Sequence, residues 1–440
     1  MFKLKTIPFL IFLALFSILE VEIQSQDSKP RVVVMTDGEV DDRSSMIRFL
    51  LYSNDVELLA IIETNSVYQR EGHSNKDWYD KQVNAYEEVH PNLIKHDSDY
   101  PTADQIRALS YVGDEDPKHI VVNNRSPERR PGMEPQIKPD DWADTPGSDR
   151  IVEILLEEDP RQVYIQAWGG GNTAARAFYK IQTEFPDEYD RAISKAVMHN
   201  IWYQDGAGNY IETYHPKVTM LLDHYFNGTW DYGSQSFTFA FIKNEVKNNH
   251  GPLGALYPQD YVSEGDSPAF LWALKNGLRN YENPSYGGWG GRYYKVDGLA
   301  NVYADVSAAS YSRWIEAANR DFQTRLDWCV AEKFEDANHK PVIKMQGELD
   351  RSVKSGETVS LDASGTTDPD GHNMAFRWWQ YQEAGSYKKM VSVDQPGGKK
   401  ISFVAPKVDN PETIHMILEV RDRTTPSLFS FQRMIITVIP

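Results

Sequence analysis

Between about Arg31 and Ala331, short apolar runs alternate with segments whose apolar positions recur every three or four residues. Unbroken apolar runs are typical of strands buried on both faces, and the longer spacing is typical of helices that bury one face. Strands that alternate with helices in this way build parallel sheets. We therefore predict an α/β domain with a mostly parallel, Rossmann-like sheet over residues 30–338. The predicted strands are 32–35, 58–62 and 163–167, and the predicted helices are 44–52, 151–156 and one that starts near Thr173.

After Lys340 the period of the apolar positions changes to two, most clearly at Ile414, Met416 and Leu418. Apolar residues at every second position indicate strands with one face in a core and the other in water. Several short strands of this kind, separated by turn-rich segments, are typical of a β-sandwich. The sequence thus predicts a second domain, a β-sandwich, over residues 341–440, and its turn at 364–371 resembles that of immunoglobulin-like modules. Its predicted strands are 342–345, 358–361, 374–381, 400–404, 414–420 and 434–439.

The first residues have the pattern of a secretory signal peptide. Lys3 and Lys5 precede an apolar run from Ile7 to Leu19, and small residues near Ser25 offer a cleavage site. The run is shorter than the ~20 apolar residues that a transmembrane helix needs. We therefore expect residues 1–26 to be removed and the mature protein to be secreted or periplasmic, with no membrane partner.

Composition narrows the classes of partner. The 440 residues carry 46 Lys and Arg against 64 Asp and Glu, a formal charge of -18. So acidic a surface repels phosphate backbones, which argues against nucleic acid as a partner. Cys329 is the single cysteine, so the chain forms no disulfide within itself. The polar segment from Val121 to Ser148 predicts a long loop, for which a binding loop or lid and a disordered stretch are equal alternatives.

The segment that leaves the first predicted strand carries four acids, Asp37, Glu39, Asp41 and Asp42. The carboxyl ends of parallel strands are where α/β folds bind ligands. Carboxylates this close repel one another unless a cation or hydrogen bonds offset the charge, and oxygen ligands in this number favour Ca²⁺ or Mg²⁺ over Zn²⁺. The plainer alternative is that the acids cap the next helix, whose dipole favours acids in its first turn. One acid would suffice for that, so we favour a metal site.

This acidic segment resembles the opening signature of the nucleoside hydrolases, in which a strand is followed by Asp-x-Asp-x-x-x-Asp-Asp. Asp37, Asp41 and Asp42 match the last three acids, and Met35 stands where the family has the first. The resemblance implies calcium-dependent hydrolysis of an N-glycosidic bond in a nucleoside or related small-molecule glycoside. It also implies that Asp37 ligates the Ca²⁺ and activates a metal-bound water, that Asp41 binds the sugar diol, and that Asp42 ligates the Ca²⁺.

Three later segments extend the resemblance. Asn65 follows the second predicted strand, where the family places a sugar-binding asparagine. Trp-Gly-Gly-Gly-Asn-Thr at 168–173 resembles the family's Gly-rich turn, which implies that the Gly171 carbonyl ligates Ca²⁺ and that Asn172 contacts the sugar. Asp266, just before a Ser-Pro pair, resembles the closing metal ligand, although such a run also begins ordinary helices.

Two departures from the family bear on catalysis. Gly265 stands where many members have a histidine that protonates the leaving base. The segment with Asn209 and Glu212, which resembles a substrate-binding Gly-Asn and Glu of the family, is shorter than the family's. His199 and His215 are candidates for the missing acid, although an isolated histidine is more often structural or exposed.

The motifs together resemble a subgroup of nucleoside hydrolase-like proteins that carry a C-terminal β domain and are described as cellulose-binding. This resemblance covers nearly the whole mature chain. It implies an alternative function, a carbohydrate-binding protein that keeps the hydrolase scaffold with little or no catalysis and whose partner is a polysaccharide. A third class is a structural module of an exported complex. Family members often assemble, so the resemblance also allows a homo-oligomer.

Aromatic side chains bear on the carbohydrate-binding alternative, because sugars stack on flat rings. The Gly-rich segment Tyr281–Tyr294 contains Trp289, for which sugar contact and core packing are equal expectations. Trp378 and Trp379 are adjacent on a predicted strand and so point to opposite faces. We expect one of them in the core of the sandwich and the other at a surface.

Overall fold

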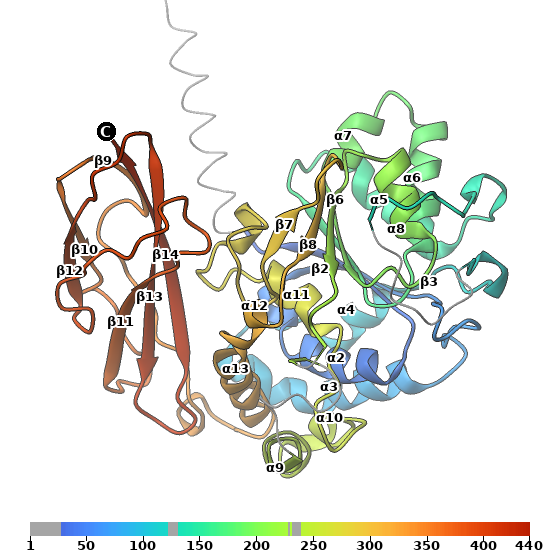
Figure 1. Cartoon of the computed structure of the whole chain (residues 1–440). Coiled ribbons are helices and arrows are strands. Elements are labelled where there is room, and N and C mark those ends of the chain that lie inside the picture. Colours follow the sequence, from blue (N-terminus) through green and yellow to red (C-terminus); the bar gives the residue numbers. More distant parts are fainter. Residues whose placement is uncertain (1–27, 122–130, 228, 231–238) are drawn as a thin grey trace, which may run out of the picture.

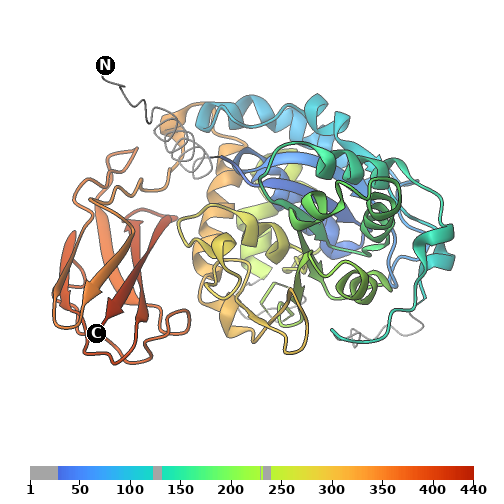
Figure 2. The same ribbon diagram turned by 90° about the horizontal axis from the view of Figure 1, so that it is seen from above.

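The computed structural model of the chain describes residues 28–121, 131–227, 229–230 and 239–440. Strands β1 to β8 form one large sheet with helices on both faces, and strands β9 to β14 form an all-β unit beside it (Figures 1 and 2). The predicted fold class, an α/β domain followed by a β domain, is confirmed. The predicted signal peptide, 1–26, and residues 122–130 of the predicted polar loop lie outside the described residues.

The α/β sheet has the strand order β3-β2-β1-β4-β5-β6-β8-β7, and every neighbouring pair is parallel except β7 and β8. Three of its strands, β1, β2 and β4, were predicted from their apolar runs alone. The bounds are β1 Arg31–Thr36, β2 Glu57–Glu63, β3 Ser110–Val112, β4 Val163–Ala167, β5 Ala196–Ile201, β6 Thr219–Asp223, β7 Tyr293–Lys295 and β8 Val302–Asp305.

Strand β1 illustrates how the sequence produces a sheet with two buried faces. Val32 and Val34 belong to one apolar core and Val33 and Met35 to another, because successive side chains of a strand point to opposite faces. Helices α2, α3, α11 and α13 contribute to the first core, and α5, α6, α7 and α8 contribute to the second. Complete burial of an apolar side chain contributes about 1.5–3 kcal/mol, so a polar substitution anywhere in 32–35 is disfavoured.

The helices that cover the sheet come from the segments between its strands. The bounds are α2 Val40–Leu50, α3 Trp78–His96, α4 Ala103–Ala108, α5 Pro146–Leu156, α6 Asn172–Glu184, α7 Tyr189–Ser194, α8 Ala207–Tyr214, α9 Phe239–Phe241, α10 Gly251–Ala255, α11 Ser267–Ala273, α12 Ala309–Ser312 and α13 Ile315–Trp328. Helix α5 begins inside the predicted loop 121–148, because Thr145 and Ser148 form a capping box that stabilises a helix start there.

The β domain is a sandwich of two sheets around its own apolar core. One sheet has the order β11-β13-β14-β9, and the other pairs β10 with β12. Trp378 is 3% exposed and lies in this core, as expected for one of the two adjacent tryptophans. The bounds are β9 Asp350–Lys354, β10 Thr358–Asp362, β11 Met374–Gln380, β12 Lys400–Val404, β13 Glu412–Asp422 and β14 Phe429–Ile439.

Two predictions for the β domain were wrong. The segment 342–345 forms no strand, and within it only Val342 makes a bridge, to Thr367. Strand β9 has no counterpart among the predicted strands. Its side chains alternate between exposed and half-buried, and it lies at a sheet edge parallel to β14. An edge strand buries little apolar surface, so its sequence carries a weak period-two signal.

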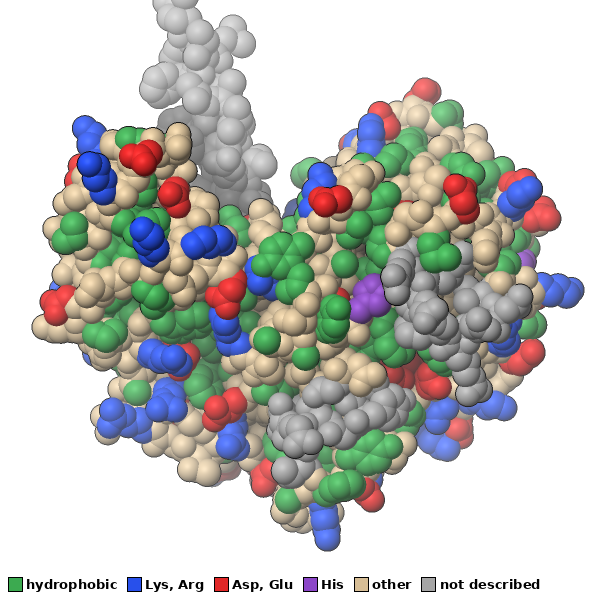
Figure 3. All heavy atoms as spheres, viewed as in Figure 1, with side chains coloured by type: hydrophobic (Ala, Val, Ile, Leu, Met, Phe, Trp, Pro, Cys, Tyr) green, Lys and Arg blue, Asp and Glu red, His purple; other side chains and the backbone are tan. Residues whose placement is uncertain are grey.

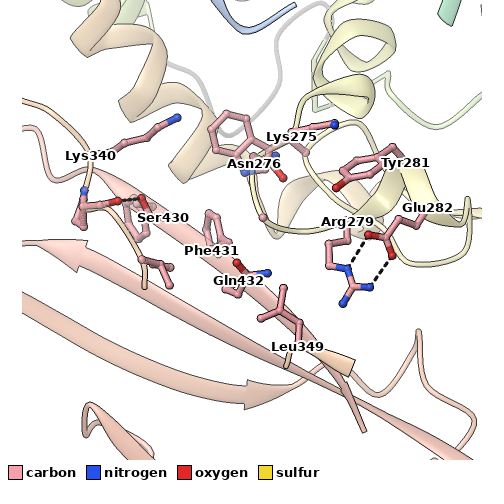
Figure 4. A pocket seen from close by; sticks show the side chains of 15 residues that line it. Lys275, Asn276, Arg279, Tyr281, Glu282, Lys340, Leu349, Ser430, Phe431 and Gln432 are labelled. Atoms are coloured by element: carbon pink, nitrogen blue, oxygen red, sulfur yellow. Dashed lines mark hydrogen bonds and ion pairs between the residues drawn. The ribbon is translucent and has the colours of Figure 1, made fainter. Parts of the chain in front are cut away.

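Arginine side chains make much of the polar contact between the two domains. Arg433 of β14 is fully buried and donates hydrogen bonds to three backbone carbonyls in the segment 278–287 of the α/β domain. Arg279 forms ion pairs with Glu282 beside it and with Asp350 of β9 across the boundary. Figure 4 shows these α/β residues facing β14 across a pocket of about 330 Å³ between the domains.

Aromatic side chains that the sequence offers for sugar stacking are used in packing. Trp289 is 3% exposed and belongs to the core of the α/β domain, so core packing is the correct alternative for this residue. The ring centroid of Trp379 lies 5.8 Å from that of Trp314 across the domain boundary. Tyr286 packs edge-on against His415 of the sandwich. The segment 281–294 therefore packs partly in the α/β core and partly against the sandwich.

Two further features of the structure concern membrane-spanning helices and surface charge. Among the described residues, no helix is both long enough and apolar enough to span a lipid bilayer. On the face seen in Figure 3, acidic and basic side chains are interspersed, and Lys and Arg gather into no continuous patch.

Candidate functional site

The predicted site residues follow strands that meet at one edge of the α/β sheet. Strand β1 lies between β2 and β4, so the later strands of the sheet are added on both sides of β1. Open α/β sheets bind ligands in the crevice outside the carboxyl ends of the strands at such a point. The residues after β1, β2, β4 and β5 are brought together there.

The turn after β1 is held in one conformation by its own acids. The Thr36 hydroxyl and the Asp37 N–H donate hydrogen bonds to Asp42 Oδ1, at 2.5 and 3.0 Å. The Glu39 N–H donates to Asp37 Oδ1 at 3.0 Å. Gly38 has φ 70°, and a Cβ there would lie 2.8 Å from the Trp78 indole nitrogen, so both backbone and space require glycine. The turn therefore presents the Asp37 and Asp42 carboxylates in fixed orientations.

Three carboxylates converge at this turn. One oxygen each of Asp41, Asp42 and Asp266 lie within 4.8 Å of one another, although Asp266 comes from the start of α11, far along the chain. Asp42 is 2% and Asp266 1% exposed. Burial, followed by the negative charges of Asp37 and Asp41, raises the pKa of the Asp42 carboxyl well above its ordinary value. A bound cation would offset the repulsion among these carboxylates and so favour the ionised form of Asp42.

Asp37 lies next to these three carboxylates, and only one of its two side-chain oxygens accepts a hydrogen bond from the described residues. Its side chain is 1% exposed, and Oδ2 has no hydrogen-bond partner among the described residues. The backbone of Gly169 passes so close that a Cβ there would lie 2.9 Å from Asp37 Oδ2. A buried carboxylate oxygen without a donor is costly, so this atom is suited to a cation or to the proton of a bound ligand.

The Gly-rich turn after β4 brings backbone against the other site residues. A Cβ at Gly170 would lie 2.4 Å from the Asn65 carbonyl, which accepts a hydrogen bond from the Gly170 N–H. The carbonyl of Gly171, the predicted calcium ligand, accepts the first helical hydrogen bond of α6 from Ala175 at 3.0 Å. A carbonyl oxygen has two lone pairs, so one remains for a cation.

The two predicted sugar-binding asparagines are oriented by backbone contacts. Asn65 donates to the Arg70 carbonyl at 3.0 Å, and Asn172 donates to the His119 carbonyl at 3.0 Å. The side-chain oxygen of each is buried and has no hydrogen-bond partner among the described residues. Each amide therefore keeps an acceptor for a ligand hydroxyl.

Asn209 and Glu212 belong to helix α8, and their printed contacts form a group of their own. Asn209 donates to Glu212 at 2.7 Å, and Glu212 also accepts from the Gly132 N–H and the Tyr203 hydroxyl. None of these contacts reaches the acids after β1. The assignment of Asn209 and Glu212 to substrate binding remains a prediction.

The two histidines offered as substitutes for the missing acid are held elsewhere. His199 Nε2 lies 3.1 Å from Asp223 and 2.9 Å from the Tyr293 hydroxyl, inside the protein. His215 Nδ1 lies 2.7 Å from the Tyr189 hydroxyl, and burial lowers the pKa of His215 to about 4. An imidazole with so low a pKa is uncharged at neutral pH, so it lacks the imidazolium proton that a general acid would donate.

Gly265 is explained by the acids it adjoins. A Cβ at this position would lie 2.8 Å from Asp41 Oδ2 and 3.1 Å from the Phe226 ring. A histidine there would displace one of the two. The glycine at position 265, where the family often has a histidine, therefore leaves room for Asp41 and Phe226 to pack closely.

A pocket of about 280 Å³ is lined by acidic and by aromatic side chains. Its acidic lining residues are Glu39, Asp41 and Asp42. Among its aromatic lining residues, the ring centroids lie 6.4 Å apart for Tyr68 and Trp202 and 4.9 Å apart for Trp202 and Phe226. The remaining lining residues are Trp168, Ile201, Gln204 and Asn227.

Comparison with models of known protein families identifies the family of this chain. The model of the nucleoside hydrolase-like domain of the cellulose-binding protein Sde182 matches residues 31–293, more than half of the chain. The chain belongs to this family. The model of the C-terminal domain of the cellulose-binding protein Sde0182 matches residues 358–438, within the sandwich of this Sde182-family chain.

Solved structures extend the comparison. A nucleoside hydrolase-related hypothetical protein from Saccharophagus degradans, described as associated with carbohydrate metabolism, is 30% identical, with a TM-score of 0.80 over 93% of this chain and 100% of that one. The effector XOO4466 and the type III effector XopQ, solved with adenosine diphosphate ribose, are each 10% identical. Their TM-scores are 0.39 and 0.38, over 72% of this chain and over 98% and 99% of the two effectors. Similarity this low supports no inference about function. Comparison with curated proteins gives no significant match.

The aromatic lining residues of the pocket were not predicted from the sequence of this Sde182-family chain. Tyr68 follows β2, Trp202 follows β5 and Phe226 follows β6, so their places after the strands were the available signal. Trp202 has φ 57°, a left-handed conformation that is rare for a bulky residue. Such strain is found mostly at functional sites, where surrounding contacts hold it.

The strain at Trp202 predicts an order of stability between two variants. Trp202→Gly and Trp202→Ala both remove the ring, but only glycine adopts φ 57° without cost. We expect the glycine variant to be about 1 kcal/mol more stable than the alanine variant. Urea unfolding of both, followed by circular dichroism, measures the difference. Equal midpoints would show that the backbone relaxes once the ring is gone.

Glu63, at the end of β2, predicts a pH effect. Burial, followed by the charge of Glu115, raises the pKa of Glu63 from 4.5 to about 7. Because the folded-state pKa is the higher one, the stabilisation is complete below pH 4.5 and is lost as the pH rises through about 7. Glu63→Gln should therefore be more stable than wild type at pH 8 by about 1 kcal/mol, a value reduced for partial exposure. Unfolding at pH 5 and 8 tests this, and a gain at pH 5 alone would contradict it.

Proposed function

We propose that this chain is a secreted, calcium-dependent hydrolase of N-glycosidic bonds that acts on a nucleoside or a related glycoside. One observation carries the proposal, namely the pocket that Asp41 and Asp42 line together with aromatic side chains. Its carboxylates suit a cation and a hydroxyl-rich sugar, and the rings of Tyr68, Trp202 and Phe226 suit a flat, apolar group. A nucleoside combines these two parts. A volume of about 280 Å³ suits one such molecule better than a polymer, since clefts for small ligands begin near ~300 Å³.

The donor set fits Ca²⁺. Hard oxygen atoms are what Ca²⁺ prefers, and it takes six to eight of them, so a partial set of protein ligands leaves room for hydroxyl groups. In the proposed site Asp37, Asp42 and Asp266 supply carboxylates and Gly171 supplies its carbonyl. When bound, Ca²⁺ would act as a Lewis acid toward water and the sugar diol.

Asp37 is the proposed general base. Its Oδ1 is oriented by the Glu39 N–H, and its Oδ2 is the buried oxygen without a donor. That oxygen accepts a proton from water as the water attacks the anomeric carbon, while the C–N bond breaks and its electron pair leaves with the base. Asp41 and the free amide oxygens of Asn65 and Asn172 hold the sugar hydroxyls.

The leaving group must receive a proton from a source other than residue 265. Glycine occupies that position, and His199 and His215 are held in other contacts. We assign no acid. The aromatic rings of the pocket would pack against the departing base and hold its position.

A carbohydrate-binding function is the second candidate. It is supported by the family's description as cellulose-binding and by the link of the S. degradans relative with carbohydrate metabolism. In this alternative the acidic cluster stabilises the fold or holds a sugar, without turnover. The rings in the pocket would stack on a sugar rather than on a base.

The deciding experiment is sugar release from a nucleoside panel by the purified mature protein, with Ca²⁺ or with a chelator, beside binding to insoluble cellulose. Calcium-dependent release of free ribose supports the hydrolase. Cellulose binding without release from any nucleoside would overturn it in favour of the second candidate. Bovine albumin in the same pull-down controls for non-specific adsorption.

A further inference from the structure

The sandwich domain holds a second group of metal-ligating side chains, far in sequence from the acids after β1. Asp368 and His372 belong to the turn between β10 and β11, and Asp422 ends β13. One ligand atom from each lies within 4.8 Å of the others. The group mixes one imidazole with two carboxylates.

The group has unused ligand capacity. Asp368 Oδ1 accepts the N–H groups of Asp370 and His372, both at 3.0 Å, while Oδ2 is buried without a hydrogen-bond partner among the described residues. The Asp368 side chain is 1% exposed. His372 Nδ1 likewise lacks a hydrogen bond and lies 3.6 Å from Asp368 Oδ1, too far for one. In a hydrogen-bonded His–Asp pair these two atoms would lie closer together than 3.6 Å.

We propose that Asp368, His372 and Asp422 bind a divalent cation of the Zn²⁺ class. An imidazole nitrogen is a ligand that Zn²⁺ favours, whereas Ca²⁺ prefers oxygen alone. Three protein ligands leave a fourth tetrahedral position for water. The His372 side chain is 38% exposed, which gives a cation its path from solvent.

The contacts around the group resemble those that orient metal ligands. The Asn338 amide donates to Asp422 Oδ2 at 2.7 Å, and the Thr424 hydroxyl donates to Asp422 Oδ1 at 2.9 Å. His339 Nδ1 lies 2.9 Å from Asp370, within the same turn as Asp368. Partners of this kind fix the direction of a ligating carboxylate. Because Asn338 and His339 lie in the segment that joins the domains, the cation would also fasten the sandwich to that segment.

The test uses the full mature chain carrying Asp42→Asn, so that the acids of the α/β domain contribute least. Chelator-treated protein is titrated with ZnCl₂ alone by calorimetry, and with Co²⁺, whose visible absorption is strong in a tetrahedral site and weak in an octahedral one. One equivalent of Zn²⁺ should bind and raise the melting temperature. His372→Ala should weaken binding by about tenfold or more. His90→Ala, a partly buried histidine of α3, is the matched control and should change nothing.

His372 is suited to this test because its exposed side chain can be removed with little loss of packing. Equal Zn²⁺ affinity of the Asp42→Asn chain with and without His372→Ala would overturn the proposal. So would a preference for Ca²⁺ over Zn²⁺, since that would show that the imidazole takes no part. Neither result bears on nucleoside hydrolysis, which concerns a different domain.

Discussion

If Ca²⁺ binds as proposed, it raises the melting temperature of the wild-type protein, and replacing Asp42 with asparagine is expected to abolish that rise. Removing one partner of a buried ionic contact costs about 3–5 kcal/mol, which corresponds to a loss of affinity of about a hundredfold or more. Without Ca²⁺ the variant should be at least as stable as wild type. Asparagine keeps an oxygen for Thr36 and the Asp37 N–H, and it removes a buried charge whose ionisation is disfavoured. Differential scanning calorimetry with and without Ca²⁺ measures both effects.

The control for Asp42→Asn is Asp77→Asn, the same isosteric change at an exposed acid that pairs with Lys81 on the surface of α3. That variant should keep the full calcium response. A calcium response of wild-type size in Asp42→Asn would show that the converging carboxylates are not the calcium site. A variant less stable than wild type in chelator would show instead that the Asp42 charge is already compensated within the protein.

Replacing Asp37 with asparagine is expected to lower kcat for nucleoside hydrolysis by about 10²–10⁴-fold, the usual contribution of a general base. The amide cannot accept the proton, although it can still be oriented by the Glu39 N–H. The assay is run at saturating Ca²⁺, because Asp37 is also a proposed metal ligand. A calorimetric scan of the same sample shows whether Ca²⁺ is bound.

Glu39→Gln is the matched control for Asp37→Asn, since Glu39 is an acid of the same turn and lines the same pocket without an assigned role. Its kcat should stay within about threefold of wild type, a difference of less than 1 kcal/mol. If Asp37→Asn kept more than a tenth of the wild-type kcat with Ca²⁺ bound, another group would have to be the base.

Local patterns were sufficient to place the acids of the site. The apolar run 32–35 predicts a buried strand, and the acids that follow must then lie at its carboxyl end. Trp289 shows the limit of this reasoning. An aromatic ring among glycines suits both a sugar surface and a core, and only its 3% exposure in the folded chain decides between them. Strand β9 shows a second limit, because a strand at a sheet edge needs little apolar surface.

What the sequence determined by itself was the succession of elements and the acids at the end of β1, because strand and helix periods and turn residues are properties of neighbouring positions. Only the tertiary structure decided which distant residues meet. It brought Asp266 to Asp42 and Asp422 to His372, and it placed Trp202 in the same pocket as the carboxylates. Such contacts depend on strand order and helix packing, which short-range sequence patterns do not encode.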